Sequence, residues 1–257
     1  MAPRDRFVAR AQASALARPT TVVFSHLTAG ILHGLPLVGP LPERLDILVR
    51  GASGGRSEQG LLAHRSPDDD QPTEIEADVW ATSLERTLID VAATVPLFRS
   101  LPMLDAALRA KMTSTERLAQ HLEGRSALRA PARVMRAVLA ADGKSENAGE
   151  SLSRARMIEC GFAVPVLQKK LPVREGPTPR VDYFWPDVDL IGEFDGFIKY
   201  GRAGGEVDAD ALWKEKRRED ALRAVGHGMV RWVWDEAWNA PTLTRLLVQA
   251  GVPRWMR

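Results

Sequence analysis

Apolar residues recur first at helical and then at strand-like spacing along the first half of the chain. Residues 4–17 have the pattern of an amphipathic helix. A second helix is predicted after Ser25, a candidate N-cap, because apolar side chains recur every four residues at Leu27, Ile31 and Leu35. Three segments then alternate in the manner of strands: "RLDILVR", "GLLAHRS" and "TEIEADVWA". This pattern predicts a small sheet near the N-terminus.

Two more helices are predicted after these strands. The segment "TSLERTLIDVAATV" has Thr82 and Ser83 as capping options. The segment "TSTERLAQHLEG" carries the capping-box spacing from Thr113 to Glu116, and Gly124 is expected to end it. The first half of the chain is therefore predicted to be a small sheet with helices, in the mixed α/β class.

A different pattern begins beyond the polar stretch at residues 141–149, although the break could also fall in "EGRSALRAP". A helix is predicted over "SENAGESLSRARMIECG", ending at Gly161. Three extended segments, a helix and a strand follow, in "AVPVLQKKLPV", "RVDYFW", "DLIGEFD", "ADALWKEKRREDALRAVG" and "GMVRWVW". A last helix is predicted near residues 235–250. We therefore predict two domains, residues 1–140 and 141–257.

The composition narrows the possible functions without choosing one. The 257 residues are 45% hydrophobic and 26% charged, as in globular proteins. No run of about 18 apolar residues is present, and the N-terminus lacks the apolar core of a secretory signal. We therefore expect a cytoplasmic protein with no membrane partner. A single cysteine, Cys160, excludes an intramolecular disulfide and a thiolate zinc cluster. The net charge of +2 means that any contact with nucleic acid must come from a local patch.

Acidic residues gather in the stretch "RVDYFWPDVDLIGEFDG". Strand alternation puts Glu193 and Asp195 on one face, roughly 6 to 7 Å apart. Asp182 would join them if its strand pairs through the short turn. Carboxylates that share a partly buried place need a compensating cation, and Mg²⁺ or Mn²⁺ takes oxygen ligands while leaving positions for water and phosphate. The pattern favours a metal site at these three residues. The alternative, solvated acids paired with basic residues, is preferred for Asp187 and Asp189 in the turn.

The helix that contains "WKEKRREDALR" has two interpretations of similar weight. Its basic residues include Lys214, Arg217 and Arg218, interleaved with acidic ones. A solvated helix face with internal salt bridges explains this mixture, and so does contact with the phosphates of a nucleic acid.

Other residues whose side chains could take part in binding or catalysis are not assigned such roles. Trp232 and Trp234 alternate with Val233 in a strand and are predicted to be core residues, not platforms for stacking bases. Ser25 and His26 lack the context of a nucleophile elbow, which argues against a hydrolase triad. The five histidines show no metal-ligand spacing.

The second half of the chain resembles a known nuclease family. The predicted order of helix, three strands, helix and strand resembles the PD-(D/E)XK nuclease core. The position of an Asp on the second strand and of the pattern Glu-x-charged on the third strand adds to this resemblance. The stretch "VDYFWPDVDLIGEFDG" is similar to the branch akin to very-short-patch-repair endonucleases. The resemblance covers about residues 145–236. It implies a restriction-endonuclease-like αβββαβ core that hydrolyses phosphodiester bonds, with DNA as the partner.

The resemblance also implies roles for individual residues. Asp182 and Glu193 would be metal ligands, and a metal-bound water would be the nucleophile. Glu150, on the helix before the sheet, matches the acidic residue that completes such sites, with Glu146 as its rival. Gln168, on the first strand, would lie at the edge of the site.

One position departs from the family pattern. The family has Lys two residues after the Glu, and this chain has Asp195 there. Lys199, or Lys214 and Arg218 on the next helix, could supply the missing positive charge. A catalytically inactive copy of the fold is the alternative that this departure implies.

The first half of the chain resembles the AbiEi-type antitoxin regulators that are common in actinobacteria. The resemblance rests on "VVFSHLTAGILHG", "HRSP" and "WATSLERTLIDVAAT". Those regulators usually begin with a winged helix-turn-helix, and only residues 1–21 precede the first of these stretches here, which is too few for that module. Either the module is absent or the start is truncated, which weakens a promoter-binding interpretation and leaves a partner-binding one open. The resemblance thus implies a domain that recognises a protein partner or helps to bind nucleic acid.

Two functions follow from the sequence. The first is a metal-dependent nuclease, acting in a phage-defence or toxin–antitoxin context. The alternative is a non-catalytic, antitoxin-like transcriptional regulator that uses the nuclease fold as a binding scaffold.

Overall fold

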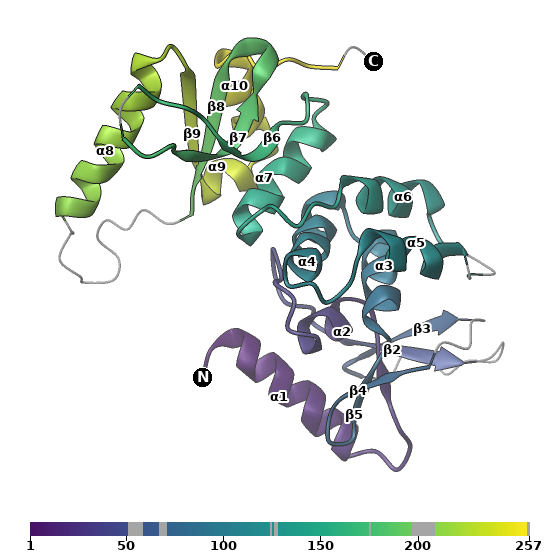
Figure 1. Cartoon of the computed structure of the whole chain (residues 1–257). Helices are drawn as coiled ribbons and strands as arrows, with labels where there is room; N and C mark the ends of the chain where they lie inside the picture. Colours follow the sequence, from purple (N-terminus) through teal and green to yellow (C-terminus); the bar gives the residue numbers. More distant parts are fainter. Residues whose placement is uncertain are drawn as a thin grey trace. The chain divides into compact units, whose positions relative to one another are not determined.

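The computed structural model describes residues 1–50, 59–66, 71–123, 125, 128–174, 176–196 and 209–255. It confirms the mixed α/β class, with two sheets and helices around each (Figure 1). The chain divides into two compact units, Met1–Ala148 and Gly149–Arg257. The division falls within the polar stretch at 141–149, slightly later than the predicted limit at residue 140. None of the described helices is long and apolar enough to cross a membrane.

The first unit contains a mixed sheet with the strand order β3-β2-β1-β5-β4. Its elements in chain order are α1 (Pro3–Leu16), β1 (Val23–Phe24), α2 (His26–Leu32), β2 (Leu45–Arg50), β3 (Leu61–Ser66), β4 (Thr73–Glu76), β5 (Val79–Ala81), α3 (Leu84–Thr94), α4 (Leu97–Arg109), α5 (Thr115–Glu123) and α6 (Pro131–Ala140). Strand β2 runs parallel to β3 and antiparallel to β1, and β1 runs parallel to β5.

Helix α1 packs against this sheet through one apolar face. Phe7, Ala11 and Ala15 recur at helical spacing and are buried. They belong to the same apolar cluster as Phe24 of β1 and Ala81 of β5. Helix α3 is buried along most of its length and contacts α2, α4, α5 and α6. The first unit therefore has its core between the sheet and the helices.

Local sequence signals were misleading at two places in this unit. The segment 73–81 was predicted as one strand, but it forms the hairpin β4–β5, which turns at Asp78 with φ +63°. The predicted capping box of α5 is wrong. Ser114 accepts the backbone N–H of Arg117 at 3.3 Å, while the Thr113 hydroxyl donates to Glu85 of α3 at 2.8 Å. A tertiary contact therefore takes the hydroxyl that local spacing assigned to the helix end.

The second unit contains a four-stranded sheet with the order β6-β7-β8-β9. Its elements are α7 (Ala148–Glu159), β6 (Val166–Lys170), β7 (Arg180–Trp185), a short 3₁₀ turn η1 (Pro186–Val188), β8 (Leu190–Asp195), α8 (Ala209–Ala224), β9 (Gly228–Val233), α9 (Trp234–Trp238) and α10 (Ala240–Gln249). Strand β7 is antiparallel to β6 and β8, and β9 is parallel to β8. The predicted αβββαβ order is confirmed, and the predicted last helix is two helices.

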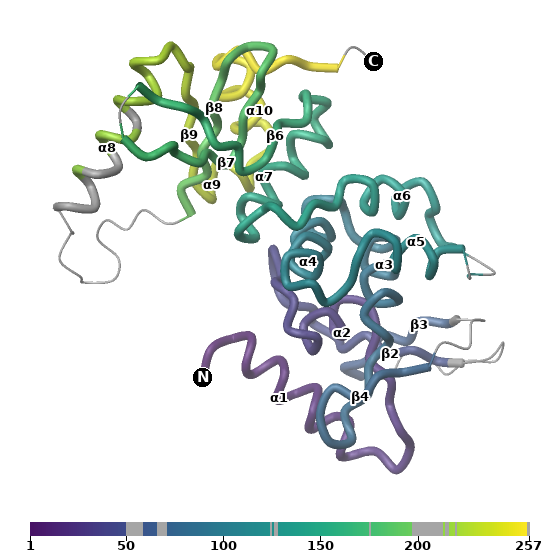
Figure 2. The backbone as a smooth tube through the Cα atoms, in the orientation of Figure 1, coloured from purple at the N-terminus to yellow at the C-terminus, as the bar shows by residue number. Residues whose placement is uncertain are grey.

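Helices α7 and α8 cover opposite faces of this sheet. On β8, Ile191 shares an apolar cluster with Leu222 of α8. The next residue, Gly192, lies under the rings of Trp185 and Trp232, and the Trp232 indole N–H donates to Ser153 of α7 at 2.8 Å. Because neighbouring strand residues point to opposite faces, the two helices form separate layers. The hairpin β7–β8 between them can be followed in Figure 2.

Candidate functional site

Two of the three acidic residues predicted to bind a metal, Asp182 and Glu193, are brought close together in the second unit. The β7–β8 register pairs Tyr183 with Gly192, so Asp182 and Glu193 occupy the next opposed positions. The Asp182 carboxylate accepts the backbone N–H of Phe194 at 2.9 Å. This bond fixes the carboxylate across the hairpin, beside the base of the Glu193 side chain.

Gln168 of β6 connects this pair to α7. Its side-chain amide donates to the Glu150 carboxylate at 3.0 Å and to the Asp182 carboxylate at 3.3 Å. Gln168 also has φ +51°, in the left-handed region that side chains other than glycine rarely adopt. Such backbone strain concentrates at functional sites. The amide thus holds together two carboxylates that would otherwise repel each other.

Glu193 is more buried than Asp182, with 7% of its surface exposed. One carboxylate oxygen, Oε2, accepts a 2.6 Å bond from the guanidinium of Arg218 in α8. The other, Oε1, is buried and has no hydrogen-bond partner among the described residues. Burial raises the pKa of Glu193 to about 7, Arg218 opposes this rise, and the nearby charge of Asp182 adds to it. One oxygen of Glu193 therefore remains available for a ligand.

The remaining predicted site residues lie around this centre. Asp195 is at the end of β8, 3.9 Å from Arg231 of β9, and its side chain is 45% exposed. Arg217 is exposed on α8. Lys199 lies outside the described residues, as does the side chain of Lys214. Arg218 also donates to the backbone carbonyl of Arg180 at 2.8 Å, so two bonds anchor its guanidinium.

The donor set at Asp182 and Glu193 suits a hard divalent cation. Within the described part of the chain, no group of three or more His, Cys, Asp or Glu side chains is arranged to hold a metal. Mg²⁺, however, is commonly held by one or two carboxylates, with waters and phosphate oxygens completing its shell. The buried Oε1 of Glu193 and the adjacent Asp182 provide two such carboxylates. Glu150 is connected to Asp182 through the side-chain amide of Gln168, which donates to both carboxylates.

Arg231 was not predicted as a residue of the site. This residue lies between Val230 and Trp232 in β9, directly beside Glu193 in the parallel register. Its charge contributes to the electrostatics of Glu193. The signal that could have revealed it is an arginine at an inward strand position, next to a strand that carries acids.

We expect Glu193→Gln to flatten the dependence of stability on pH when no metal is present. The pKa of Glu193 is about 7 in the folded chain and 4.5 as the unperturbed value. Between these values the folded state keeps the proton and the unfolded state loses it, so stability falls as the pH rises through this window. The total loss is on the order of 3 kcal/mol. Thermal unfolding in EDTA over this range measures it, and parallel curves for both proteins would contradict the burial of this charge.

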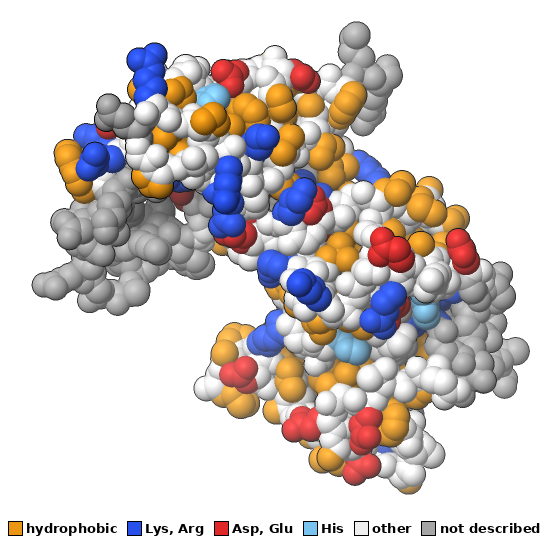
Figure 3. All heavy atoms as spheres, viewed as in Figure 1, with side chains coloured by type: hydrophobic (Ala, Val, Ile, Leu, Met, Phe, Trp, Pro, Cys, Tyr) orange, Lys and Arg blue, Asp and Glu red, His pale blue; other side chains and the backbone are white. Residues whose placement is uncertain are grey.

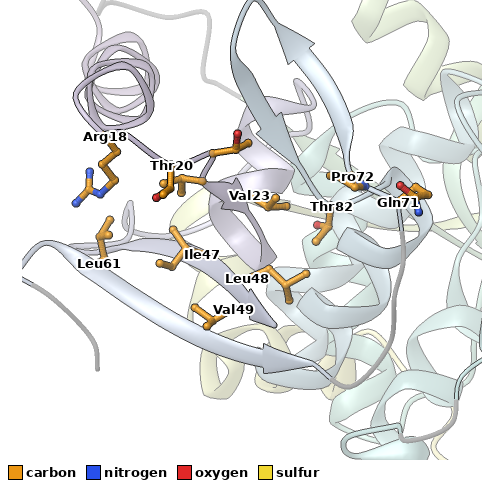
Figure 4. A pocket seen from close by; sticks show the side chains of 12 residues that line it. Arg18, Thr20, Val23, Ile47, Leu48, Val49, Leu61, Gln71, Pro72 and Thr82 are labelled. Carbon is orange, nitrogen blue, oxygen red and sulfur yellow. The ribbon is translucent and has the colours of Figure 1, made fainter. Parts of the chain in front are cut away.

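A separate cavity of about 600 Å³ lies in the first unit (Figure 4). Its walls include Val23, Ile47 and Thr82, and its described lining contains no acidic side chain. The charged residue there, Arg18, donates to the hydroxyl and carbonyl of Ser14 at 2.6 and 2.8 Å. The described lining of this cavity therefore includes no carboxylate, imidazole or thiolate that could hold a metal.

The comparisons with known proteins identify relatives but no activity. No family model and no solved structure matches the chain. Two uncharacterized proteins of Mycobacterium tuberculosis, one from each of two strains, are each 29% identical to it over 161 residues. The match covers 63% of this chain and 57% of each relative, so the chain spans less than two thirds of their length.

Proposed function

We propose that the second unit is a metal-dependent nuclease of the PD-(D/E)XK type that hydrolyses phosphodiester bonds in DNA. The observation that carries the proposal is the placement of Asp182 and Glu193 at opposed positions of one hairpin, with one buried oxygen of Glu193 left without a described partner. Glu150 is joined to Asp182 through the side-chain amide of Gln168. The αβββαβ order and the strand directions support it.

Each residue of the centre has a role in this proposal. Asp182 and Glu193 would hold Mg²⁺ or Mn²⁺, which supplies an activated water and stabilises negative charge at phosphorus. Gln168 keeps Asp182 and Glu150 in place through its two donated bonds. Arg218 provides the positive charge that the family pattern takes from a lysine, and its planar guanidinium suits a phosphate group.

The ion pair between Arg218 and Glu193 favours a second candidate function. A guanidinium bonded to Glu193 at 2.6 Å already compensates this carboxylate without a metal. Under this alternative the chain is a non-catalytic, antitoxin-like regulator, and the second unit binds nucleic acid as a scaffold. On the face drawn in Figure 3, Lys and Arg lie among acidic and apolar side chains, as the net charge of +2 suggests.

Cleavage assays distinguish the two candidates. The purified chain is incubated with single- and double-stranded DNA and RNA, in Mg²⁺, Mn²⁺ or EDTA. The nuclease proposal expects cleavage of DNA that needs the metal and stops in EDTA. Binding of DNA by the folded protein without cleavage in either metal would support the scaffold instead.

We also propose that the first unit binds a protein partner, as its resemblance to antitoxin regulators implies. Co-purification with the products of neighbouring genes tests this. Purification of the chain without any such product would count against this proposal.

A further inference from the structure

A second polar cavity, of about 410 Å³, lies in the first unit. Residues of α2, β3 and α3 line it, together with residues that follow α5. Its charged and polar lining consists of a histidine pair, His26 and His64, the carboxylate of Asp90 and the arginines Arg65, Arg86, Arg125 and Arg129. Neither candidate function described above uses these residues.

The two histidines form a fixed, stacked pair. Their ring centroids are 3.6 Å apart and the rings are inclined by 20°. His64 Nε2 lies 2.8 Å from the Asp46 carboxylate, and His26 Nδ1 lies 3.0 Å from the Ser25 hydroxyl. The other oxygen of Asp46 accepts the Thr28 hydroxyl at 3.2 Å. The two rings are thus held in place by contacts with Ser25 and Asp46, which do not line the cavity.

His26 is built into this position at a conformational cost. It has φ +50°, which is unfavourable for a residue with a side chain, and it is 8% exposed. Strained residues of this kind persist where the surrounding structure requires them and are common at ligand sites. Burial, with the neighbouring His64, lowers the pKa of His26 to about 3. The His26 ring is therefore neutral near pH 7 and adds no positive charge to the cavity.

The described lining of the cavity carries more positive than negative charge. Four of these residues are arginines and one, Asp90, is acidic. Arg86 donates to Asp90 at 2.6 Å, and Arg125 lies 3.5 Å from the other oxygen of the same carboxylate. Both arginines are largely buried, while Arg65 and Arg129 are exposed at the rim. Two guanidinium groups that share a single carboxylate leave one positive charge uncompensated, and this excess charge favours the binding of a second anion.

We propose that this cavity binds the phosphate group of a ligand the size of a mononucleotide. Guanidinium groups match phosphate oxygens in geometry and charge. The volume of about 410 Å³ is within the range of small-ligand pockets. Ala63, Ala93 and Leu128 supply apolar lining for a base, beside the stacked imidazoles. Under this proposal the first unit is a mononucleotide-binding module, and the proposal does not depend on the nuclease proposal for the second unit.

Calorimetric titration of the full chain with AMP, inorganic phosphate and adenosine tests the proposal. AMP is expected to bind more tightly than phosphate, and adenosine more weakly than either. Arg129→Gln and Arg65→Gln change exposed side chains, so folding is retained. Each is expected to weaken AMP binding by about tenfold, the value of one charge-assisted hydrogen bond. Arg44→Gln, an exposed arginine that does not line the cavity, is the matched control.

Three outcomes would overturn the proposal. The first is the absence of binding of AMP and phosphate at millimolar concentration by chain that circular dichroism shows to be folded. The second is equal weakening by Arg44→Gln and Arg129→Gln, which would indicate attraction to net charge only. The third is equal affinity for phosphate and AMP, which would reject the mononucleotide assignment.

Discussion

Glu193→Ala is expected to reduce metal-dependent DNA cleavage at least about a hundredfold, since removing a group that stabilises transition-state charge costs about 10²–10³ in kcat. The substitution removes one of the two carboxylates proposed to hold the metal. It should not unfold the second unit, because burial raises the pKa of Glu193 and its charge opposes folding near neutral pH. Single-turnover cleavage of labelled DNA, beside a thermal unfolding curve, measures both effects.

Asp187→Ala is the control for this experiment. Asp187 lies in the turn of the same hairpin and is exposed. Its removal is expected to leave cleavage unchanged. If Glu193→Ala cleaved as fast as the wild type, the site would be assigned to the wrong residues. If both variants lost activity equally, the loss would reflect the hairpin and not the carboxylate.

Gly192→Ala is expected to destabilise the second unit by about 1–3 kcal/mol, the usual cost of overpacking a core. A Cβ at this position would lie 2.8 Å from the Trp232 ring and 2.9 Å from the Trp185 ring. Both rings are almost fully buried and cannot move aside without disturbing the sheet. Chemical denaturation measures the change in the free energy of unfolding.

Gly196→Ala is the matched control, four residues further along the chain. A Cβ there would lie 3.5 Å from the Phe194 ring, which is an ordinary contact. Its free energy of unfolding is expected to stay within about 0.5 kcal/mol of the wild-type value. Equal stability of the two glycine variants would contradict the close packing of the tryptophans on β8.

Strand alternation was a sound guide to the acidic hairpin. The strands predicted as "RVDYFW" and "DLIGEFD" differ from β7 and β8 by at most one residue, and Asp182 and Glu193 do face each other across the pair. The short turn leaves little choice of register, and a shift by one residue would move Ile191 from the face that packs on α8 to the opposite face. Strand alternation and the length of the turn, both readable from the local sequence, therefore determine how Asp182 and Glu193 are placed. The core assignment of Trp232 is also confirmed, since 1% of its surface is exposed, whereas Trp234 was wrongly placed in the strand: it begins α9 and is half-buried.

The contacts between distant elements could not be predicted in the same way. The partner of Glu193, Arg218 on α8, was one of several cations proposed to supply the missing charge, but the helical pattern there fits a solvated face equally well and did not single it out. The histidine cluster was missed because His26 and His64 are far apart in sequence and stack only when β3 lies beside α2 and β2. Helix α4 had no clear signal, since Pro102 interrupts its pattern.

Titration of Mn²⁺ into the metal-free chain tests the central claim most directly, because it does not depend on finding the right substrate. The wild type is compared by calorimetry with Asp182→Asn and with Asp187→Asn, the same change at the exposed turn position. We expect Mn²⁺ to bind the wild type and Asp187→Asn alike, and Asp182→Asn at least about tenfold more weakly. A wild-type chain that binds no Mn²⁺, or binding that Asp182→Asn leaves intact, would contradict a metal centre at Asp182 and Glu193.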